Sequence, residues 1–294
     1  MKTLVTGGAG FVGTNLIKRL LKDGHEVVSV DNYSTGKKEN HQEGCLYHDY
    51  DLSSSHTLGI YVDHGSYPVW RELEYDVIFH IGALARIQPS LKNPHKTIFN
   101  NFISTLNILE YARQNNVKVV YAGSSTFHHG LYSSPYAWSK FSGEELCKLY
   151  SSVYDLSTAI CRFYNVYGEY QLEEGTYATV LGIFEKQYRE DKPLTITADG
   201  EQRRDFTHID DIVDGLIKCS EHNFKAEFFE LGRGVNFSIN EVAELFGKDY
   251  PREYISARKG EYDVTLADYS KAKLKLGWEP RGDIIHYIKS IVGK

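Results

Sequence analysis

The chain has 294 residues, of which 41% are hydrophobic and 24% are charged, and its formal net charge is −6. These values are typical of a globular protein with a sizeable core, and the negative charge disfavours non-specific binding to nucleic acid. The sequence contains no apolar run of the roughly 20 residues that a membrane helix needs, no C-x-x-C pair and no space for a signal peptide before the first strand, so we expect a cytoplasmic protein without a metal site or disulfide scaffold.

Short apolar strands alternate with helical segments over the first 165 residues. Strands are expected at 4–6, 26–30, 76–80, 117–122 and 157–163, and helices at 10–22, 98–114 and 136–154. This alternation predicts an α/β fold, a Rossmann-like doubly wound parallel sheet with helices on both faces. Residues 53–75, which are rich in Ser, His, Gly and Tyr, are expected to form an irregular insertion or a long loop.

The alternation loosens after about residue 165. Helices are expected at 176–190 and 210–221, and a strand at 194–196. Ser238 and Glu241 have the spacing of a capping box, which predicts the start of another helix. The C-terminal part is therefore expected to form a smaller α+β lobe.

Three glycines follow the first strand and open the first helix. Gly7 suits a tight turn, Gly10 lets the backbone approach a pyrophosphate, and Gly13 lets the helix pack closely on the sheet. The second strand is followed by Asp31, whose carboxylate can accept hydrogen bonds from adenosine ribose hydroxyls and repels a 2′-phosphate. The pattern predicts an NAD site rather than an NADP site, and the alternative is a glycine-rich turn without a ligand.

Tyr136 and Lys140 lie four residues apart at the start of a predicted helix, so they share one helix face. A lysine ammonium beside a phenol favours the phenolate and lowers the pKa of the phenol. The alternative is a surface pair, because both residue types are common. Together with the nucleotide motif, the pair indicates redox chemistry at a hydroxyl group with Tyr136 as the general base.

Several separated motifs resemble, in the same order, those of the extended short-chain dehydrogenase/reductases. The resemblance is to the NAD-dependent nucleotide-sugar epimerases and dehydratases, and most of all to UDP-glucose and UDP-galactose 4-epimerases, and it covers nearly the whole chain. The motifs are G-x-x-G-x-x-G at 7–13, D-N-x-S-T-G at 31–36, a stretch similar to H-x-A-A-x-A at 80–85, R-x-x-N-V-Y-G at 162–168, R-D-F at 204–206 and L-G-W-x-P at 276–280.

The resemblance implies an NAD site built from two groups of residues. The first group follows the first two strands and comprises Gly7, Gly10, Phe11, Val12, Gly13, Asp31, Asn32, Ser34, Thr35 and Gly36. The second group comprises Asp51, Leu52, Ile81, Gly82, Ala83, Asn101, Tyr136, Lys140 and Phe163. Asp49 is the alternative to Asp51 as the contact to adenine, and Asp51 is preferred because an apolar residue follows it.

The resemblance also implies the catalytic residues and the sugar-nucleotide site. Tyr136 would take a proton from a sugar hydroxyl, Lys140 would hold the nicotinamide ribose, and Ser124 would bind the reacting oxygen. Guanidinium groups bind phosphate oxygens with two parallel hydrogen bonds, which suits arginines to a diphosphate, although each alone could be a solvated surface charge. The expected substrate-binding residues are Ser124, Ser125, Thr126, Asn165, Tyr177, Arg204, Arg258, Glu261 and Thr265.

The residues after Ser124 favour one reaction. Related dehydratases and decarboxylases place carboxylates in this stretch, whereas Ser125 and Thr126 offer no acid to protonate a leaving hydroxyl. We therefore expect NAD-dependent 4-epimerisation of a nucleotide diphosphate sugar, by transient oxidation at C4 and hydride return to the opposite face. Thr265 leaves space for a UDP-N-acetylhexosamine or a UDP-uronic acid as well as a UDP-hexose. A dehydratase, decarboxylase or reductase of the family, and a non-catalytic NAD-binding module, are the alternatives.

The resemblance further predicts the domains and the assembly. Residues 1–165, with a return segment at 205–232, are expected to form the NAD-binding Rossmann domain, and 166–204 and 233–294 the nucleotide-sugar lobe. A homodimer is expected through the helices at 98–114 and 136–154. Ser124 and Tyr136 are only twelve residues apart, about half the usual separation, and we expect His128 and His129 between them to be a solvated loop pair.

Overall fold

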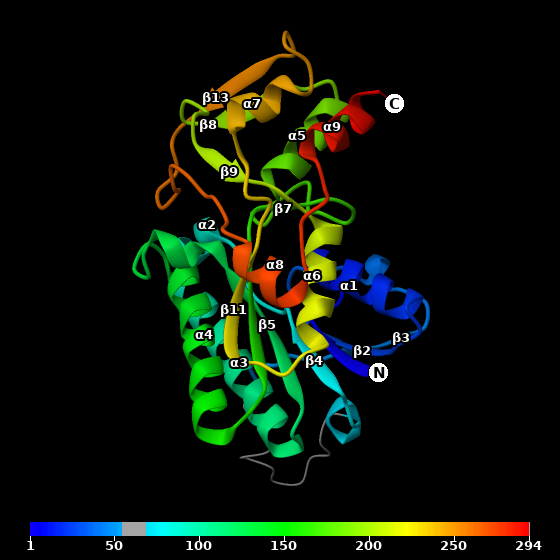
Figure 1. Cartoon of the computed structure of the whole chain (residues 1–294). Coiled ribbons are helices and arrows are strands. Elements are labelled where there is room, and N and C mark those ends of the chain that lie inside the picture. The colour runs from blue at the N-terminus through cyan, green and yellow to red at the C-terminus, as the bar shows by residue number, and fades with distance from the viewer. Residues whose placement is uncertain (55–68, 294) are drawn as a thin grey trace.

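A seven-stranded parallel sheet forms the centre of the computed structural model, which describes residues 1–54 and 69–293 (Figure 1). The strand order is β11-β6-β5-β4-β1-β2-β3, and every neighbouring pair is parallel. The strands are β1 (Lys2–Thr6), β2 (Glu26–Asp31), β3 (Cys45–Asp49), β4 (Val77–His80), β5 (Lys118–Ser124), β6 (Thr158–Phe163) and β11 (Lys225–Leu231). The strand order reverses between β1 and β4, and in open parallel sheets ligands bind at the carboxyl ends of the strands at such a reversal.

Helices cover both faces of this sheet because residues alternate along each strand. Val5 packs in a core with α1 (Phe11–Lys22) and α6 (Ile209–Ser220), whereas its neighbour Leu4 packs in a core with α3 (Pro94–Asn115) and α4 (Pro135–Tyr154). Figure 1 shows α3 and α4 side by side on one side of the sheet, with α1 and α6 on the other. The predicted doubly wound fold class is confirmed.

The insertion expected at 53–75 lies only partly within the described residues, since 55–68 fall outside them. After these, a 3-10 helix η3 (Val69–Glu72) brings Trp70 into the core, where its ring lies 5.5 Å from that of Tyr111 on α3. The hydroxyl of Tyr75 donates to the carbonyl of Trp70 over 2.7 Å. The end of the expected loop is therefore a core anchor, which its polar composition did not indicate.

A second lobe with its own apolar core lies beyond the carboxyl ends of the sheet (Figure 1). It is made of two strand pairs and three helices: β8 (Leu194–Thr197) with β13 (Arg252–Ile255), β9 (Arg203–Asp205) with β12 (Asn236–Ser238), α5 (Val180–Arg189), α7 (Ile239–Glu244) and α9 (Ile284–Val292). The predicted capping box of Ser238 and Glu241 is confirmed at the start of α7. The helix expected from residue 176 begins only at Val180, because the Thr179 hydroxyl caps it by accepting the N–H of Gly182.

Short elements connect the two parts. The strands β7 (Val166–Tyr167) and β10 (Thr207–His208) pair in parallel, and α8 (Ser270–Leu276) packs against α6 and β11. Three further short helices follow strand or loop ends, namely η1 (Lys38–Asn40), α2 (Ile87–Lys92) and η4 (Ser125–His129). The sequence patterns predicted none of them, because each is shorter than two turns and carries no helical periodicity.

The buried Trp70 provides a test of the fold. Trp70→Ala removes a fully buried ring, so we expect the free energy of unfolding to fall by about 3–5 kcal/mol in a urea titration. Leu274→Ala on α8 is the matched control, because Leu274 is 84% exposed and its loss should change stability by less than about 0.5 kcal/mol. Equal stabilities of the Trp70 variant and the control would contradict the anchor role.

Candidate active site

A cavity of about 980 Å³ lies at the carboxyl ends of the parallel strands and extends to the second lobe. Its wall is formed by the turn after β1, the ends of β2, β4, β5 and β6, and loops of the second lobe. Of the residues predicted for the site, all but Gly36, Asn101 and Lys140 border it. The structure therefore brings the predicted cofactor, catalytic and substrate residues to one cavity.

The glycine turn between β1 and α1 can only be built from residues without side chains. A Cβ on Gly13 would lie 2.2 Å from the carbonyl oxygen of Gly7, and a Cβ on Gly7 would lie 2.7 Å from the Cα of Gly82. Gly7 also has a φ of +71°, in the region that side chains disfavour. The N-cap residue of α1, Gly10, has no side chain to cap the helix, so the first N–H groups of α1 are available to a phosphate.

Asp31 occupies the end of β2 at the cavity wall. One carboxylate oxygen accepts the N–H of Ala9 over 2.9 Å and the other accepts the N–H of Tyr33 over 2.8 Å. Burial raises the pKa of Asp31, and these two hydrogen bonds oppose the rise. Each carboxylate oxygen keeps a further lone pair, so the group can still accept a ribose hydroxyl. Gly36 packs behind Asp31 rather than in the wall, since a Cβ there would lie 2.9 Å from its carboxylate.

The geometry distinguishes the two candidate acids for adenine. Asp51 and the following Leu52 border the cavity, whereas Asp49 does not. The carboxylate of Asp49 instead lies 3.9 Å from the ammonium of Lys38 on the exposed surface. The position of Asp51 agrees with its choice over Asp49.

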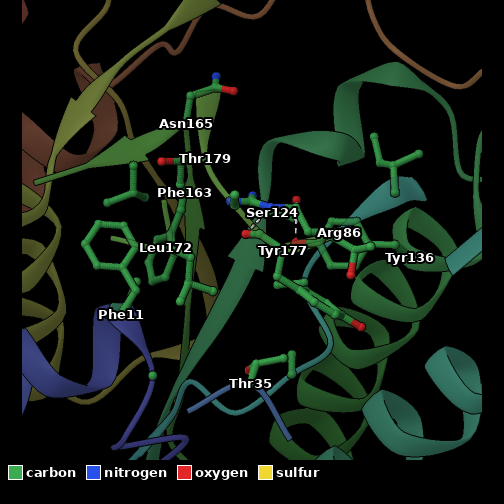
Figure 2. A pocket seen from close by; sticks show the side chains of 18 of the residues that line it. Phe11, Thr35, Arg86, Ser124, Tyr136, Phe163, Asn165, Leu172, Tyr177 and Thr179 are labelled. Atoms are coloured by element: carbon green, nitrogen blue, oxygen red, sulfur yellow. Dashed lines mark hydrogen bonds between the residues drawn. The ribbon is translucent and has the colours of Figure 1, made fainter. Parts of the chain in front are cut away.

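Ser124 and Tyr136 meet at the cavity wall (Figure 2). Ser124 ends β5, and Tyr136 lies in the first turn of α4, which starts there because the Ser134 hydroxyl caps the helix and Pro135 follows it. The Tyr136 hydroxyl donates to the Ser124 hydroxyl over 3.4 Å. The Ser124 oxygen also accepts the hydroxyl of Thr126 over 3.0 Å, so its own proton remains available for a ligand oxygen.

The electrostatics of Tyr136 differ from the prediction. Burial raises the pKa of Tyr136, while the Ser124 hydrogen bond and the positive charge of Arg86 lower it. The ammonium of Lys140 lies 4.4 Å from the centre of the Tyr121 ring and does not border the cavity. Burial lowers the pKa of Lys140 to about 8, and the charge of Glu144 opposes this. Arg86 is thus a cation that lowers the pKa of Tyr136, and the contact of the Lys140 ammonium is with the ring of Tyr121.

Asn101 is a positioning residue on α3 rather than a part of the wall. It is buried, its side-chain oxygen accepts the N–H of Leu84 over 2.8 Å, and its amide group donates to the carbonyl of Leu84 and to the hydroxyl of Ser139. These three hydrogen bonds tie the loop after β4 to α3 and α4. In this structure Asn101 therefore places the 81–85 loop and does not itself border the cavity.

The second lobe contributes two arginines to the wall. Burial lowers the pKa of Arg204, and the charges of Glu261 and Asp263 oppose this, whereas Arg258 is exposed beside the cavity. Arg204 donates to the backbone carbonyl of Arg203 over 2.9 Å. Two guanidinium groups on one wall can hold an anionic ligand such as a diphosphate.

Asn165 and Thr265 are fixed to one another at the entrance to the second lobe. The amide nitrogen of Asn165 donates to the hydroxyl of Thr265 and to the carbonyl of Asp205, each over 3.0 Å. The Thr265 hydroxyl also accepts the N–H of Asp205 over 3.1 Å. The donors of Asn165 are therefore occupied by protein, which leaves its side-chain oxygen for a ligand.

The short loop between Ser124 and Tyr136 is held by aromatic and ionic contacts. His128 pairs with Glu230 on β11, and the ring of His129 stacks on Tyr262 at 4.0 Å. Arg162, which is paired with Glu144 at 2.6 Å, packs on the Phe127 ring. His128 is exposed, as expected of a solvated pair, whereas His129 is half-buried, and both rings have partners that the sequence did not predict. Neither histidine borders the cavity.

The sequence did not predict several residues that line the cavity. Arg86 is the most informative, because it directly follows the 80–85 motif and interrupts an apolar stretch with a charge, which is a signal the sequence did offer. Others lie in loops whose approach to the sheet no local pattern encodes. They include Tyr50, Ile87, Gln88, Leu172, Thr176, Thr179, Gln202 and Tyr262.

The wall is poor in acids near Tyr136. The carboxylates that border the cavity, among the residues that the structure describes, are Asp31, Asp51 and Glu261. None belongs to the segment from β5 to α4. Over residues 1–54 and 69–293 there is also no cluster of metal-ligating side chains and no helix with the length and apolar character of a membrane span.

Comparison with known proteins gives relatives over nearly the whole chain. Residues 3–232 match the NAD dependent epimerase/dehydratase family. The chain is 34% identical to the UDP-glucuronate 4-epimerase of Thermodesulfobacterium geofontis, over 98% of this chain and 94% of that protein. It is also 29% identical to UDP-glucuronic acid decarboxylase 1 of Xenopus tropicalis, over 95% of this chain and 69% of that protein.

Solved structures share the fold. The UDP-glucose 4-epimerase of Thermotoga maritima with UDP-glucose has a TM-score of 0.90 and 28% identity, over 100% of this chain and 98% of that one. The UDP-glucuronic acid 4-epimerase of Bacillus cereus, in complex with UDP-glucuronic acid and NAD, has a TM-score of 0.86 and 28% identity, with the same coverage of 100% and 98%.

Asp31 offers a test of the cofactor end of the cavity. Asp31→Ala removes the acceptor for ribose hydroxyls and the charge that repels a 2′-phosphate, so we expect NAD affinity to fall roughly 10-fold and the preference over NADP to shrink. Calorimetric titration of the apoprotein with each dinucleotide measures both. Asp49→Ala is the control, because Asp49 does not border the cavity. Equal effects of the two substitutions would contradict the assignment.

Proposed function

The chain belongs to the NAD dependent epimerase/dehydratase family, and from this premise we propose that it is an NAD-dependent 4-epimerase of UDP-sugars. The observation that carries the proposal is the hydrogen-bonded pair of Tyr136 and Ser124 in a cavity whose glycine cradle fits a dinucleotide. A base without a neighbouring acid suits the removal and return of a hydroxyl proton. The named relatives and structural neighbours act on or bind UDP-sugars, which supports the substrate class.

Each side chain has a defined task in this proposal. Tyr136 takes the proton of the sugar C4 hydroxyl and returns it after the sugar has turned, and Ser124 donates to the same oxygen. Lys140 lies one helical turn after Tyr136 and is assigned to the nicotinamide ribose. Bound NAD supplies a reversible hydride acceptor. Arg204 and Arg258 hold the diphosphate, so that the sugar can rotate while the nucleotide stays fixed.

The composition of the wall favours epimerisation over the related reactions. Elimination of water needs a group that protonates the leaving hydroxyl, and the segment with Ser125 and Thr126 provides only hydroxyls. Net reduction would consume NADPH, and Asp31 opposes a 2′-phosphate. Decarboxylation is the second candidate, because a decarboxylase is among the relatives, and its product distinguishes it.

We assign the two lobes to the two ligands. Residues 1–165 with the return segment 205–232 form the NAD-binding domain, and 166–204 and 233–294 form the nucleotide-sugar lobe. The position of β11 as an edge strand beside β6 supports the return segment, and the separate apolar core around α5, α7 and α9 supports the second unit. We also propose a cytoplasmic location, since the buried thiols of Cys161 and Cys219 lie 3.4 Å apart as free cysteines.

The product and the base can be tested together. Purified protein incubated with UDP-glucose, UDP-N-acetylglucosamine and UDP-glucuronate should form the C4 epimer of at least one without added NAD, as followed by proton NMR. Tyr136→Phe should reduce the rate roughly 10²- to 10⁴-fold, because the general base is lost, while NAD binding is retained. A 4-keto-6-deoxy sugar or a pentose as the product would contradict epimerisation. Full activity of the variant would exclude Tyr136 as the base.

The outer faces of α3 and α4 support a homodimer. Phe99 is 48% exposed on α3, and Leu149 and Val153 are 50% and 59% exposed on α4, with Trp138 on the same face. We propose that two copies bury these side chains in a four-helix bundle.

Sedimentation tests this assembly. The wild-type protein should sediment as a dimer, and Leu149→Glu combined with Val153→Glu should give a folded monomer, because charges would be buried at the interface. Leu274→Glu on α8 is the control and should stay dimeric. A monomeric wild type would contradict the assembly.

A further inference from the structure

Arg86 is a cation in the cavity wall that no carboxylate of the described residues neutralises. It lies immediately before α2, and its Nε donates to the backbone carbonyl of Tyr177 over 3.0 Å. The two terminal nitrogens have no acceptor within residues 1–54 and 69–293, whereas Arg162 elsewhere in the core is paired with Glu144. The contact with Tyr177 fixes the guanidinium plane and leaves its fork directed to other partners.

Arg86 is half-buried in the wall, and no salt bridge pairs it with a carboxylate of the described residues. Burial lowers the pKa of Arg86, yet the group remains a cation at neutral pH. The titratable group that favours its charge is the phenol of Tyr136, which is neutral while it carries its proton. A partly desolvated cation without a counter-ion is stabilised by any anion that a ligand brings, so the wall is complementary to a negatively charged substrate group.

The position of Arg86 indicates which part of the substrate that anion belongs to. Figure 2 shows Arg86 with Ser124, Tyr136 and Tyr177, which is the end of the cavity where the sugar must react. The arginines assigned to the diphosphate, Arg204 and Arg258, come from the second lobe, whereas Arg86 is the arginine of the wall whose charge acts on Tyr136. A second anion beside the reacting carbon is absent from neutral hexoses and present in uronic acids.

We propose that Arg86 binds the C6 carboxylate of a uronic acid and makes the chain selective for UDP-uronates over neutral UDP-hexoses. The inference rests on the proposed function, since it names the sugar class of the same site. The carboxylate would accept two parallel hydrogen bonds from the terminal nitrogens, an arrangement that planar guanidinium groups favour. The buried hydroxyl of Thr265, already held by Asn165 and Asp205, adds no competing charge.

The test compares two substrates in matched variants. Epimerisation of UDP-glucuronate and of UDP-glucose is measured as kcat/KM for the wild type, Arg86→Met and Arg258→Met, each at a pH above the acidic limb of its profile. The wild type should prefer UDP-glucuronate. Arg86→Met should lower the ratio of kcat/KM for UDP-glucuronate to kcat/KM for UDP-glucose roughly 10- to 100-fold, because one charge-assisted contact is removed. Any effect that acts through Tyr136 is shared by both substrates and cancels in this ratio. Arg258→Met should lower kcat/KM for both substrates by a similar factor.

Two further measurements distinguish recognition of the carboxylate by Arg86 from an effect of Arg86 on Tyr136 alone. Arg86→Lys should keep part of the preference, because it retains the charge but not the fork. The acidic limb of the Arg86→Met profile should move to higher pH on both substrates, because the cation that lowers the pKa of Tyr136 is gone. A shifted limb with an unchanged substrate preference would show that Arg86 only positions and tunes Tyr136, and would overturn the proposal.

Measurements of substrate binding test the role of Arg86 separately from the proposed reaction. Calorimetry of the NAD-loaded protein with UDP-glucuronate and UDP-glucose needs no turnover. Tighter binding of UDP-glucuronate that disappears in Arg86→Met would support the inference even if the wild type epimerised neither sugar. Epimerisation with equal kcat/KM for the two substrates in the wild type would overturn the inference and leave the proposed function intact.

Discussion

The hydrogen bond between Tyr136 and Ser124 joins the end of a central strand to the first turn of a helix, and the site depends on this junction. β5 lies between β4 and β6 in the sheet, so its carboxyl end is fixed on both sides. The start of α4 is fixed by Ser134 and Pro135. The 3-10 helix η4 and the turn at 130–134 are all that connects them, so the two hydroxyls have little freedom to separate. The base is therefore placed by regular secondary structure rather than by a flexible loop.

The short connection also explains why its side chains are so strongly held. Phe127, His128 and His129 contact Arg162, Glu230 and Tyr262 respectively, which belong to β6, β11 and the second lobe. These contacts hold the connection on three sides. The loop thus connects the sheet to the second lobe through these contacts. Its histidines stabilise the wall without bordering the cavity.

Sequence patterns predicted the parts of the molecule that local physics determines. The parallel sheet follows from alternating apolar strands and helices, and the glycine turn follows from backbone contacts that exclude side chains, as at Gly13. The role of Arg86 could not be predicted in the same way, because it depends on Tyr177 approaching from a segment 91 residues later. Likewise, Trp70 looked like part of a loop until the core around Tyr111 was seen. Burial could not be predicted from helical spacing either, since the spacing of Tyr136 and Lys140 predicted a lowered pKa for the phenol, whereas burial raises it.

The central claim is that the chain oxidises one sugar carbon and returns the same hydride to its opposite face. The most direct measurement uses UDP-glucuronate that carries deuterium at C4, incubated with the purified protein and no added NAD. We expect the C4 epimer with the deuterium still at C4, as seen by NMR and mass spectrometry. An epimer that has lost the label to solvent, or the release of a pentose in place of an epimer, would contradict it.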